Sequence, residues 1–144
     1  MTAIDVRRAE RTALKLMRVH EQFVDGRAVL FKAHGLSAPQ YNVLRILRGA
    51  DGADLSCHEV GARMLKRVPD VTRLLDRLDA RGLITRWRCA EDRRVVRTRI
   101  TAAGLELLAD IDAPLRDLIG REFAAFAAAD LQRMDDLLDA LLGP

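Results

Sequence analysis

The sequence predicts a mainly α-helical (α+β) chain of six helices, with one two-stranded β-hairpin placed between the fourth helix and the fifth. Three observations predict it: apolar residues recur at helical steps through most of the chain, two capping boxes mark helix starts, and one stretch alternates instead. At 144 residues the chain has the size of one domain with its own core. Its composition, 49% hydrophobic and 31% charged, excludes a disordered or fibrous protein.

The first helix is expected over residues 3–32, because apolar residues recur there mostly at three- and four-residue steps and no proline interrupts them. Gly26 is expected to weaken this helix, and Gly35 is expected to end it. The apolar positions are Ile4, Val6, Ala9, Ala13, Leu14, Met17, Val24 and Phe31.

Capping boxes start the second and third helices. In each, a serine hydroxyl can accept an unpaired backbone N–H, and a Gln or Glu three residues later can reach back to the serine backbone: Ser37 with Gln40, and Ser56 with Glu59. The second helix is expected to run through Arg48 and the third to about Leu65. The glycine-rich segment 49–54 between them is predicted to be a turn.

The fourth helix has two chemically different faces. Pro69 suits its first turn, because a proline lacks the N–H that would be unpaired there, and Gly82 stops the helix after Arg81. Its apolar stripe consists of Val71, Leu74, Leu75 and Leu78. Its other face is polar and charged, and carries Asp70, Thr72, Arg73, Asp76 and Arg77, preceded by Lys66 and Arg67.

A β-hairpin is expected next, because residues 83–89 and 95–100 are alternating and β-branched around the polar connection 90–94. Residues 85–99 contain six arginines against two acidic residues, a density that phosphate groups would explain better than ordinary strand surface. The arginines are Arg86, Arg88, Arg93, Arg94, Arg97 and Arg99.

Two amphipathic helices complete the chain. Thr101 is expected to cap the fifth helix, in which Pro114 removes a backbone donor and favours a bend. The sixth helix is expected over residues 130–142. Their apolar stripes consist of Leu105, Leu108, Ile111, Leu115 and Leu118 in the fifth helix, and Leu131, Met134, Leu138 and Leu141 in the sixth.

Charge is unevenly distributed along the chain, although the total is only +3. Residues 1–35 carry 7 basic and 4 acidic groups, residues 36–104 carry 14 and 8, and residues 105–144 carry 3 and 9. The three segments are therefore +3, +6 and −6. A basic middle and an acidic tail indicate that the middle segment faces a polyanion and the tail faces away from it.

Three helices followed by a hairpin, in the basic segment, are the order of a winged helix-turn-helix, whose last helix enters the major groove of DNA. Arginine can bond guanine bidentately, and threonine offers a hydroxyl and a methyl group. The predicted DNA-binding residues of this helix and its approach are Arg67, Val68, Asp70, Thr72, Arg73 and Arg77. Those of the wing are Arg86, Arg88, Asp92, Arg93 and Arg94, with Arg94 best placed for a narrow minor groove.

These motifs together resemble the MarR family of bacterial winged-helix transcription regulators, over essentially the full length of the chain. VTRLLDRL at 71–78 followed by RGLI at 81–84 is similar to the family's recognition helix and its exit into the wing. DRR at 92–94 followed by ITAAG at 100–104 is similar to the wing tip and the start of the fifth helix, and LSxxQ at 36–40 with VL at 43–44 to the second-helix entry. The chain departs from the family at Pro69 and Asp70, where many members have Ser and Thr, and Val68 then offers an apolar contact for a thymine methyl.

The resemblance implies a ligand-responsive repressor that binds a palindromic operator as a homodimer. Residues 1–35 and 105–144 would form the dimerisation helices, and residues 36–104 the DNA-binding region. It also implies that Asp92 holds Arg94 through a charge-assisted hydrogen bond, and that a small aromatic or phenolic anion acts as effector. Tyr41 is one candidate for contacting that anion.

Two other functions stay open from the residues: a winged-helix module that binds proteins and not DNA, and a redox-sensing regulator that uses Cys57 or Cys89. Catalysis is not expected, since adjacent Cys57 and His58 point about 100° apart on a helix. Neither a metal nor another cofactor is expected, because the three histidines lack a second ligand at helical spacing. The apolar runs are too short for a membrane helix, and two cysteines far apart in sequence fit a reducing cytoplasm.

Overall fold

The computed structural model describes residues 4–143, and in this part of the chain it contains six helices and three short strands. This confirms the predicted α+β architecture; residue 3, where the first helix was expected to begin, lies outside the described residues. The elements are α1 (Val6–Ala33), α2 (Ala38–Gly49), β1 (Leu55–Ser56), α3 (Cys57–Arg63), α4 (Val71–Ala80), β2 (Ile84–Arg88), β3 (Val96–Ile100), α5 (Ala102–Glu122) and α6 (Ala128–Leu142).

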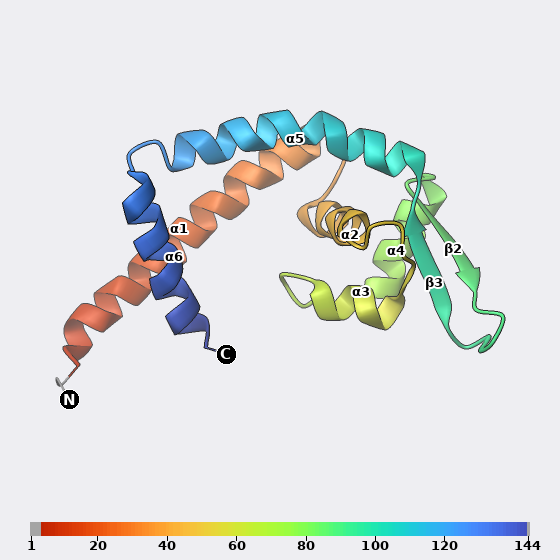
Figure 1. Cartoon of the computed structure of the whole chain (residues 1–144), viewed down its shortest axis with the longest axis horizontal. Helices are drawn as coiled ribbons and strands as arrows, with labels where there is room; N and C mark the ends of the chain where they lie inside the picture. Colours follow the sequence, from red (N-terminus) through yellow and green to blue (C-terminus); the bar gives the residue numbers. More distant parts are fainter. Residues whose placement is uncertain (1–3, 144) are drawn as a thin grey trace.

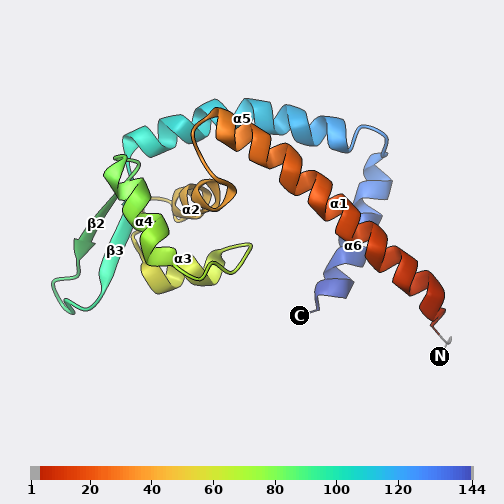
Figure 2. The ribbon, with the colours of Figure 1, turned by 180° about the vertical axis from the view of Figure 1, so that it is seen from behind.

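The molecule has two ends joined by the long helix α5 (Figure 1). Helices α2, α3 and α4 and the strands gather at one end, and α6 and the N-terminal half of α1 lie at the other (Figures 1 and 2). Helix α5 continues through Pro114, and α1 continues through Gly26, where a Cβ atom would lie 3.8 Å from Leu118 Cδ1 of α5. No helix within residues 4–143 is both long and apolar enough to cross a membrane.

The wing, which we define as β2, β3 and the loop 89–95, belongs to a three-stranded antiparallel sheet in the order β1-β3-β2. The prediction of a two-stranded hairpin was therefore incomplete: Leu55 pairs with Thr98, and Ser56 with Arg97. The missed strand has only two residues, too few to show the alternation by which strands are recognised in a sequence.

Both predicted capping boxes are present, at Ser37 and Ser56. The prediction that Pro69 lies in the first turn of the fourth helix was wrong. Helix α4 begins at Val71, because the Asp70 carboxylate accepts a hydrogen bond from the backbone N–H of Arg73 and so acts as the N-cap. Helix α3 ends at Arg63, short of the expected Leu65, because Met64 is extended.

The hydrophobic core lies mainly within the winged end of the molecule, formed by α2, α3, α4 and the strands, and it includes residues of α5. Buried leucines of α4, namely Leu74, Leu75 and Leu78, belong to this core, in which α4 packs against α2, α3 and β2. The fully buried residues of the same core include Val43, Leu44 and Leu47 of α2, Val60 of α3, and Leu108 and Ile111 of α5. Helix α4 is therefore anchored along one face only, which leaves its other face to solvent.

Gly104 marks the tightest packing, where the start of α5 meets the end of β3. A Cβ atom at this position would lie 2.3 Å from the backbone oxygen of Leu83 and 2.7 Å from Ile100 Cγ1. Because a backbone oxygen cannot move aside as a flexible side chain can, only glycine fits.

We expect Gly104→Ala to lower the free energy of unfolding by about 1–3 kcal/mol, since the methyl group must displace backbone in a packed region. Chemical denaturation followed by circular dichroism measures the change. Gly49→Ala is the matched control, because nothing lies within 4 Å of a Cβ atom there and Gly49 is also helical. Equal stability of the two variants would contradict the proposed close contact.

Candidate nucleic-acid interface

The exposed face of α4 presents four polar side chains outward. Thr72, Arg73, Asp76 and Arg77 are all exposed, on the face opposite the buried leucines. Two of the other predicted residues contribute to the start of this face: Arg67 is exposed, and Val68 is half-buried. Asp70 is exposed and caps the helix, so its carboxylate is occupied by a backbone N–H. The predicted residues therefore form one continuous surface along and just before α4.

The wing turn is held by Asp92. One oxygen of its carboxylate accepts a hydrogen bond from the backbone N–H of Arg94 at 3.0 Å, and its carbonyl oxygen accepts one from the N–H of Val95. The bond between Asp92 and Arg94 is thus made through the backbone, as in an Asx-turn, and leaves the guanidinium outside it. Arg93 and Arg94 are both exposed at the tip of the wing.

Arg88 strengthens the same turn, because its Nη1 donates a hydrogen bond to the carbonyl oxygen of Arg93 at 2.8 Å. The backbone N–H of Cys89 donates to the carbonyl oxygen of Val95 and closes the loop. Hydrogen bonds from the backbone of Asp92 and then Glu91 lower the pKa of the Cys89 thiol. The wing tip is therefore ordered by its own hydrogen bonds, with its two arginines pointing outward.

The remaining arginines of the wing pair with carboxylates. Arg86 of β2 forms an ion pair with Asp76 of α4, and its side chain is only 14% exposed. Arg97 pairs with Glu59 at 3.2 Å and with Asp54 at 3.6 Å, and Arg99 pairs with Asp54 at 3.5 Å. The dense run of arginines thus divides into a group that holds the wing in place and a group that is available to a ligand.

Arg93 and Arg94 form no ion pair with any residue in the described part of the chain, and neither do Arg73 and Arg77 of α4. The alternative in which Arg73 or Arg77 pairs within the helix is therefore not realised in this structure. These four guanidinium groups are unpaired positive charges on the surface formed by α4 and the wing tip, and Arg67 just before α4 likewise forms no ion pair within residues 4–143.

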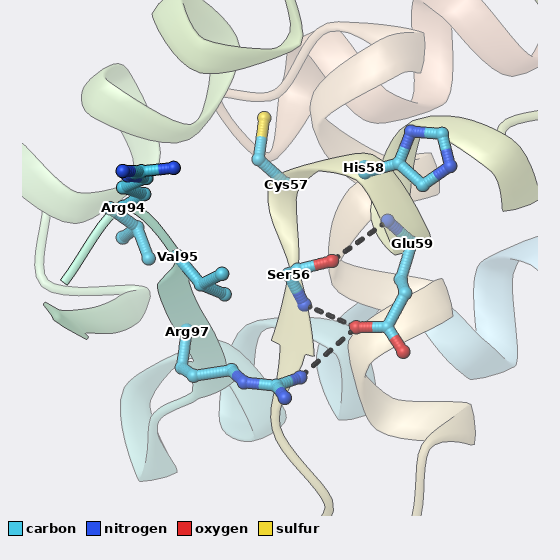
Figure 3. Close-up of a pocket in the computed structure, with 8 residues that line it drawn as sticks. Ser56, Cys57, His58, Glu59, Arg94, Val95 and Arg97 are labelled. Atoms are coloured by element: carbon cyan, nitrogen blue, oxygen red, sulfur yellow. Dashed lines mark hydrogen bonds and ion pairs between the residues drawn. The ribbon is translucent and has the colours of Figure 1, made fainter. Parts of the chain in front are cut away.

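A hollow of about 450 Å³ lies between the start of α3 and the wing, lined by residues 56–59 and 94–97 (Figure 3). On one of its sides the Glu59 carboxylate accepts hydrogen bonds from the Ser56 backbone and from Arg97 (Figure 3). Hydrogen bonds with Ser56, and then the nearby Arg97, lower the pKa of Glu59. Cys57 borders the hollow, and its Sγ lies 3.6 Å from Thr72 Oγ1. The hollow therefore adjoins both α4 and the wing.

Tyr41 lies apart from this surface, in the core. Its ring stacks on Phe31 with centroids 4.0 Å apart, and burial raises its pKa while Arg48 opposes the rise. Arg48 in turn forms an ion pair with Asp112, in which its Nη1 donates to both carboxylate oxygens, and this pair joins α2 to α5. Sequence reasoning missed Asp54, Glu59 and Asp76 as wing partners, because nothing in the local pattern shows which carboxylate meets which arginine.

Known proteins are similar to this chain in sequence and in fold. A model of the MarR family matches residues 34–95. The crystal structure of a MarR transcription factor from Planctomyces limnophilus is 35% identical, with a TM-score of 0.73, and the match covers 96% of this chain and 97% of that one. The chain belongs to the MarR family.

Two further relatives bear on the site. The HTH-type transcriptional repressor IacR of Pseudomonas putida is 28% identical over 126 residues, which are 88% of this chain and 74% of that protein. A mutant MarR from Escherichia coli, solved in complex with operator DNA, has a TM-score of 0.83 at 20% identity and covers 98% of this chain and 100% of that one. The fold of this chain is thus that of a protein solved on its operator.

We expect Arg94→Ala to weaken binding to double-stranded DNA and to lower the slope of log affinity against log salt concentration by about one, because one phosphate contact is lost. Fluorescence anisotropy with labelled DNA at several salt concentrations measures both quantities. Arg133→Ala on α6, also an exposed arginine, is the matched control and should change neither. Unchanged affinity for Arg94→Ala would remove the wing tip from the interface.

Proposed function

We propose that this MarR-family protein is a transcriptional repressor that binds a palindromic operator as a homodimer and is released by a small aromatic or phenolic anion. The observation that carries the proposal is the surface formed by α4 and the wing tip. It combines a helix buried on its back with four guanidinium groups that have no ion-pair partner among the described residues: Arg73, Arg77, Arg93 and Arg94.

Each part of this surface matches a part of DNA. Thr72, Arg73 and Arg77 project from a helix whose position is set by its core packing, which suits readout of base edges in the major groove. Arg93 and Arg94 lie at the end of a narrow hairpin, which suits the minor groove or the phosphates beside it. Repression is supported by the similarity to IacR, and operator binding by the similarity to the DNA-bound MarR of Escherichia coli.

A second copy of the chain is supported by apolar side chains that the single chain leaves in water. They lie on α1 and α6, and most of them belong to the end of the molecule away from the wing (Figure 2). The most exposed, at 55–82%, are Val6, Leu14, Met17, Val29, Leu137, Leu141 and Leu142. A surface of this extent on a stable protein marks an interface, and a twofold dimer presents two α4 helices to two operator half-sites.

An effector site is supported by the surroundings of Tyr41. Tyr41 belongs to α2, and its ring stacks on Phe31 of α1. The charges that act on its phenol are those of Arg27, Arg45 and Arg48 and of Asp112 on α5. Because an aromatic anion needs both apolar contact and positive charge, we place its site around the edge of this tyrosine. The same region holds the Arg48–Asp112 ion pair between the winged end and α5, so a bound anion would act where the two ends of the molecule join.

Titration of the purified protein onto labelled DNA from the region upstream of its own gene tests the function. We expect specific binding that weakens steeply with salt, because several arginine–phosphate contacts form. Sedimentation of the free protein accompanies the titration and should give twice the chain mass of 16.1 kDa. Absent or salt-insensitive binding by a dimeric protein would favour a protein-interaction module instead.

Salicylate serves as the probe for the effector, and cyclohexanecarboxylate, which has the charge without the aromatic ring, is its control. We expect salicylate to release DNA from the wild-type protein, and Arg48→Gln to require more of it, because a positive charge near Tyr41 is lost. Anisotropy of the DNA complex measures release. Equal responses to the two acids would contradict an aromatic-anion site.

A further inference from the structure

One ion pair, between Arg86 of β2 and Asp76, links the wing to α4. We propose that Asp76 and Arg86 are positioning residues: their pair holds the wing beside the recognition helix, so that Arg86 acts on DNA binding through Asp76 and not through a phosphate. The inference rests on the proposed DNA binding, and it assigns Arg86 a role different from the direct contact that the sequence predicts.

The burial of Arg86 supports this role. Its side chain is only 14% exposed, whereas that of Asp76 is 59% exposed. The guanidinium is therefore largely shielded from water, and the carboxylate lies at the surface. Arg86 Nη1 donates to Asp76 Oδ1. A guanidinium this far from water is unfavourable unless a carboxylate compensates it. Asp76 is the only ion-pair partner of Arg86 within the described part of the chain.

The interior side of Arg86 offers no substitute for Asp76. Arg86 Nε is buried and has no hydrogen-bond partner among the described residues. Its cross-strand neighbour, Thr98 of β3, is fully buried, and its hydroxyl is likewise without a partner there. Loss of the Asp76 carboxylate would therefore leave a buried charge with nothing else in place to compensate it, and the strand would have to move.

The choice of partner by Asp76 also shapes the surface. Arg73 lies one helical turn before Asp76, and Arg77 directly follows it, yet neither pairs with it in the described structure. Asp76 thus neutralises the half-buried Arg86, and Arg73 and Arg77 on the exposed face of α4 stay unpaired within residues 4–143. A carboxylate on a DNA-facing helix repels phosphates and so weakens DNA binding. The fixed position of the wing offsets this repulsion.

The wing is held on its other side as well. Arg97 of β3 pairs with Asp54 and Glu59, which belong to the segment around β1 and α3. Ion pairs therefore hold the wing on two sides, and within residues 4–143 Arg86–Asp76 is the one among these pairs that reaches α4, in addition to the packing of β2 against that helix. Breaking this pair should move the tip relative to α4 without removing any residue that contacts DNA.

Asp76→Ala distinguishes a positioning role from a purely electrostatic one, because the two roles predict opposite changes in DNA affinity. Removing a negative charge from a DNA-facing helix should strengthen binding if charge alone matters, and we expect it to weaken binding about tenfold, within the range of coupling between contacting residues. Asp79→Ala on the same helix is the matched control: Asp79 is exposed and has no ion pair within the described residues, so its loss should not weaken binding. Asp76→Glu keeps a carboxylate and should bind more tightly than Asp76→Ala.

Salt dependence tests Arg86 itself. Arg86→Ala should weaken binding with an unchanged salt slope, whereas Arg94→Ala lowers the slope by about one. The chain has a single tryptophan, Trp87, next to Arg86 on β2, so quenching of its fluorescence by acrylamide reports on the wing without DNA. Asp76→Ala and Arg86→Ala should both increase quenching, and Arg94→Ala should not.

The outcomes distinguish this inference from the proposed function. A wild-type protein that binds no DNA refutes the function, while the quenching experiment still tests the pair. Binding by Asp76→Ala that is as tight as that of Asp79→Ala, or a salt slope of Arg86→Ala that falls like that of Arg94→Ala, overturns the positioning role. Circular dichroism of each variant identifies global unfolding. If one of the two alanine variants is unfolded, Asp76→Glu and the alanine variant that stays folded decide.

Discussion

The burial of one face of α4 is the constraint on which the rest of the interface depends. Leu74, Leu75 and Leu78 are buried in the core where α4 packs against α2, α3 and β2, and burying each contributes about 1.5–3 kcal/mol. Because residues three and four apart share a helix face, this burial fixes the rotation of α4 about its axis. Thr72, Arg73 and Arg77 are exposed as a consequence, and the helix can present them rigidly to a ligand.

The arginines of the wing illustrate how one residue type takes two roles. Arg97 and Arg99 meet carboxylates near β1, Arg86 meets Asp76, and these pairs tie the sheet to the helices. At the tip, the Asp92 turn uses backbone N–H groups and leaves the guanidinium groups outward. The arginines of a small hairpin would otherwise repel one another. Some of them are instead neutralised by ion pairs within the protein, and the others lie at the surface.

Helix α5 runs between the two ends of the molecule and forms ion pairs with helices α1 and α2. The Arg48–Asp112 pair joins it to α2, and the bidentate Arg27–Glu122 pair, at 2.8 and 2.9 Å, joins it to α1. Both pairs are partly shielded from water, so they hold more firmly than exposed pairs do. Ion pairs therefore tie α5 both to α1 and to α2.

The sequence by itself determined the helices, the hairpin and the separation of a basic segment from an acidic one, because helical and strand periodicities, capping boxes and charge are local properties. It also indicated the DNA-facing residues of α4 and the wing tip, which remain a prediction. It did not show β1, which is too short to have a pattern, or the start of α4 at Val71, which Asp70 decides as N-cap. Only the tertiary structure decided which arginines are paired, because Asp54, Glu59 and Asp76 approach them through the fold and not through sequence spacing.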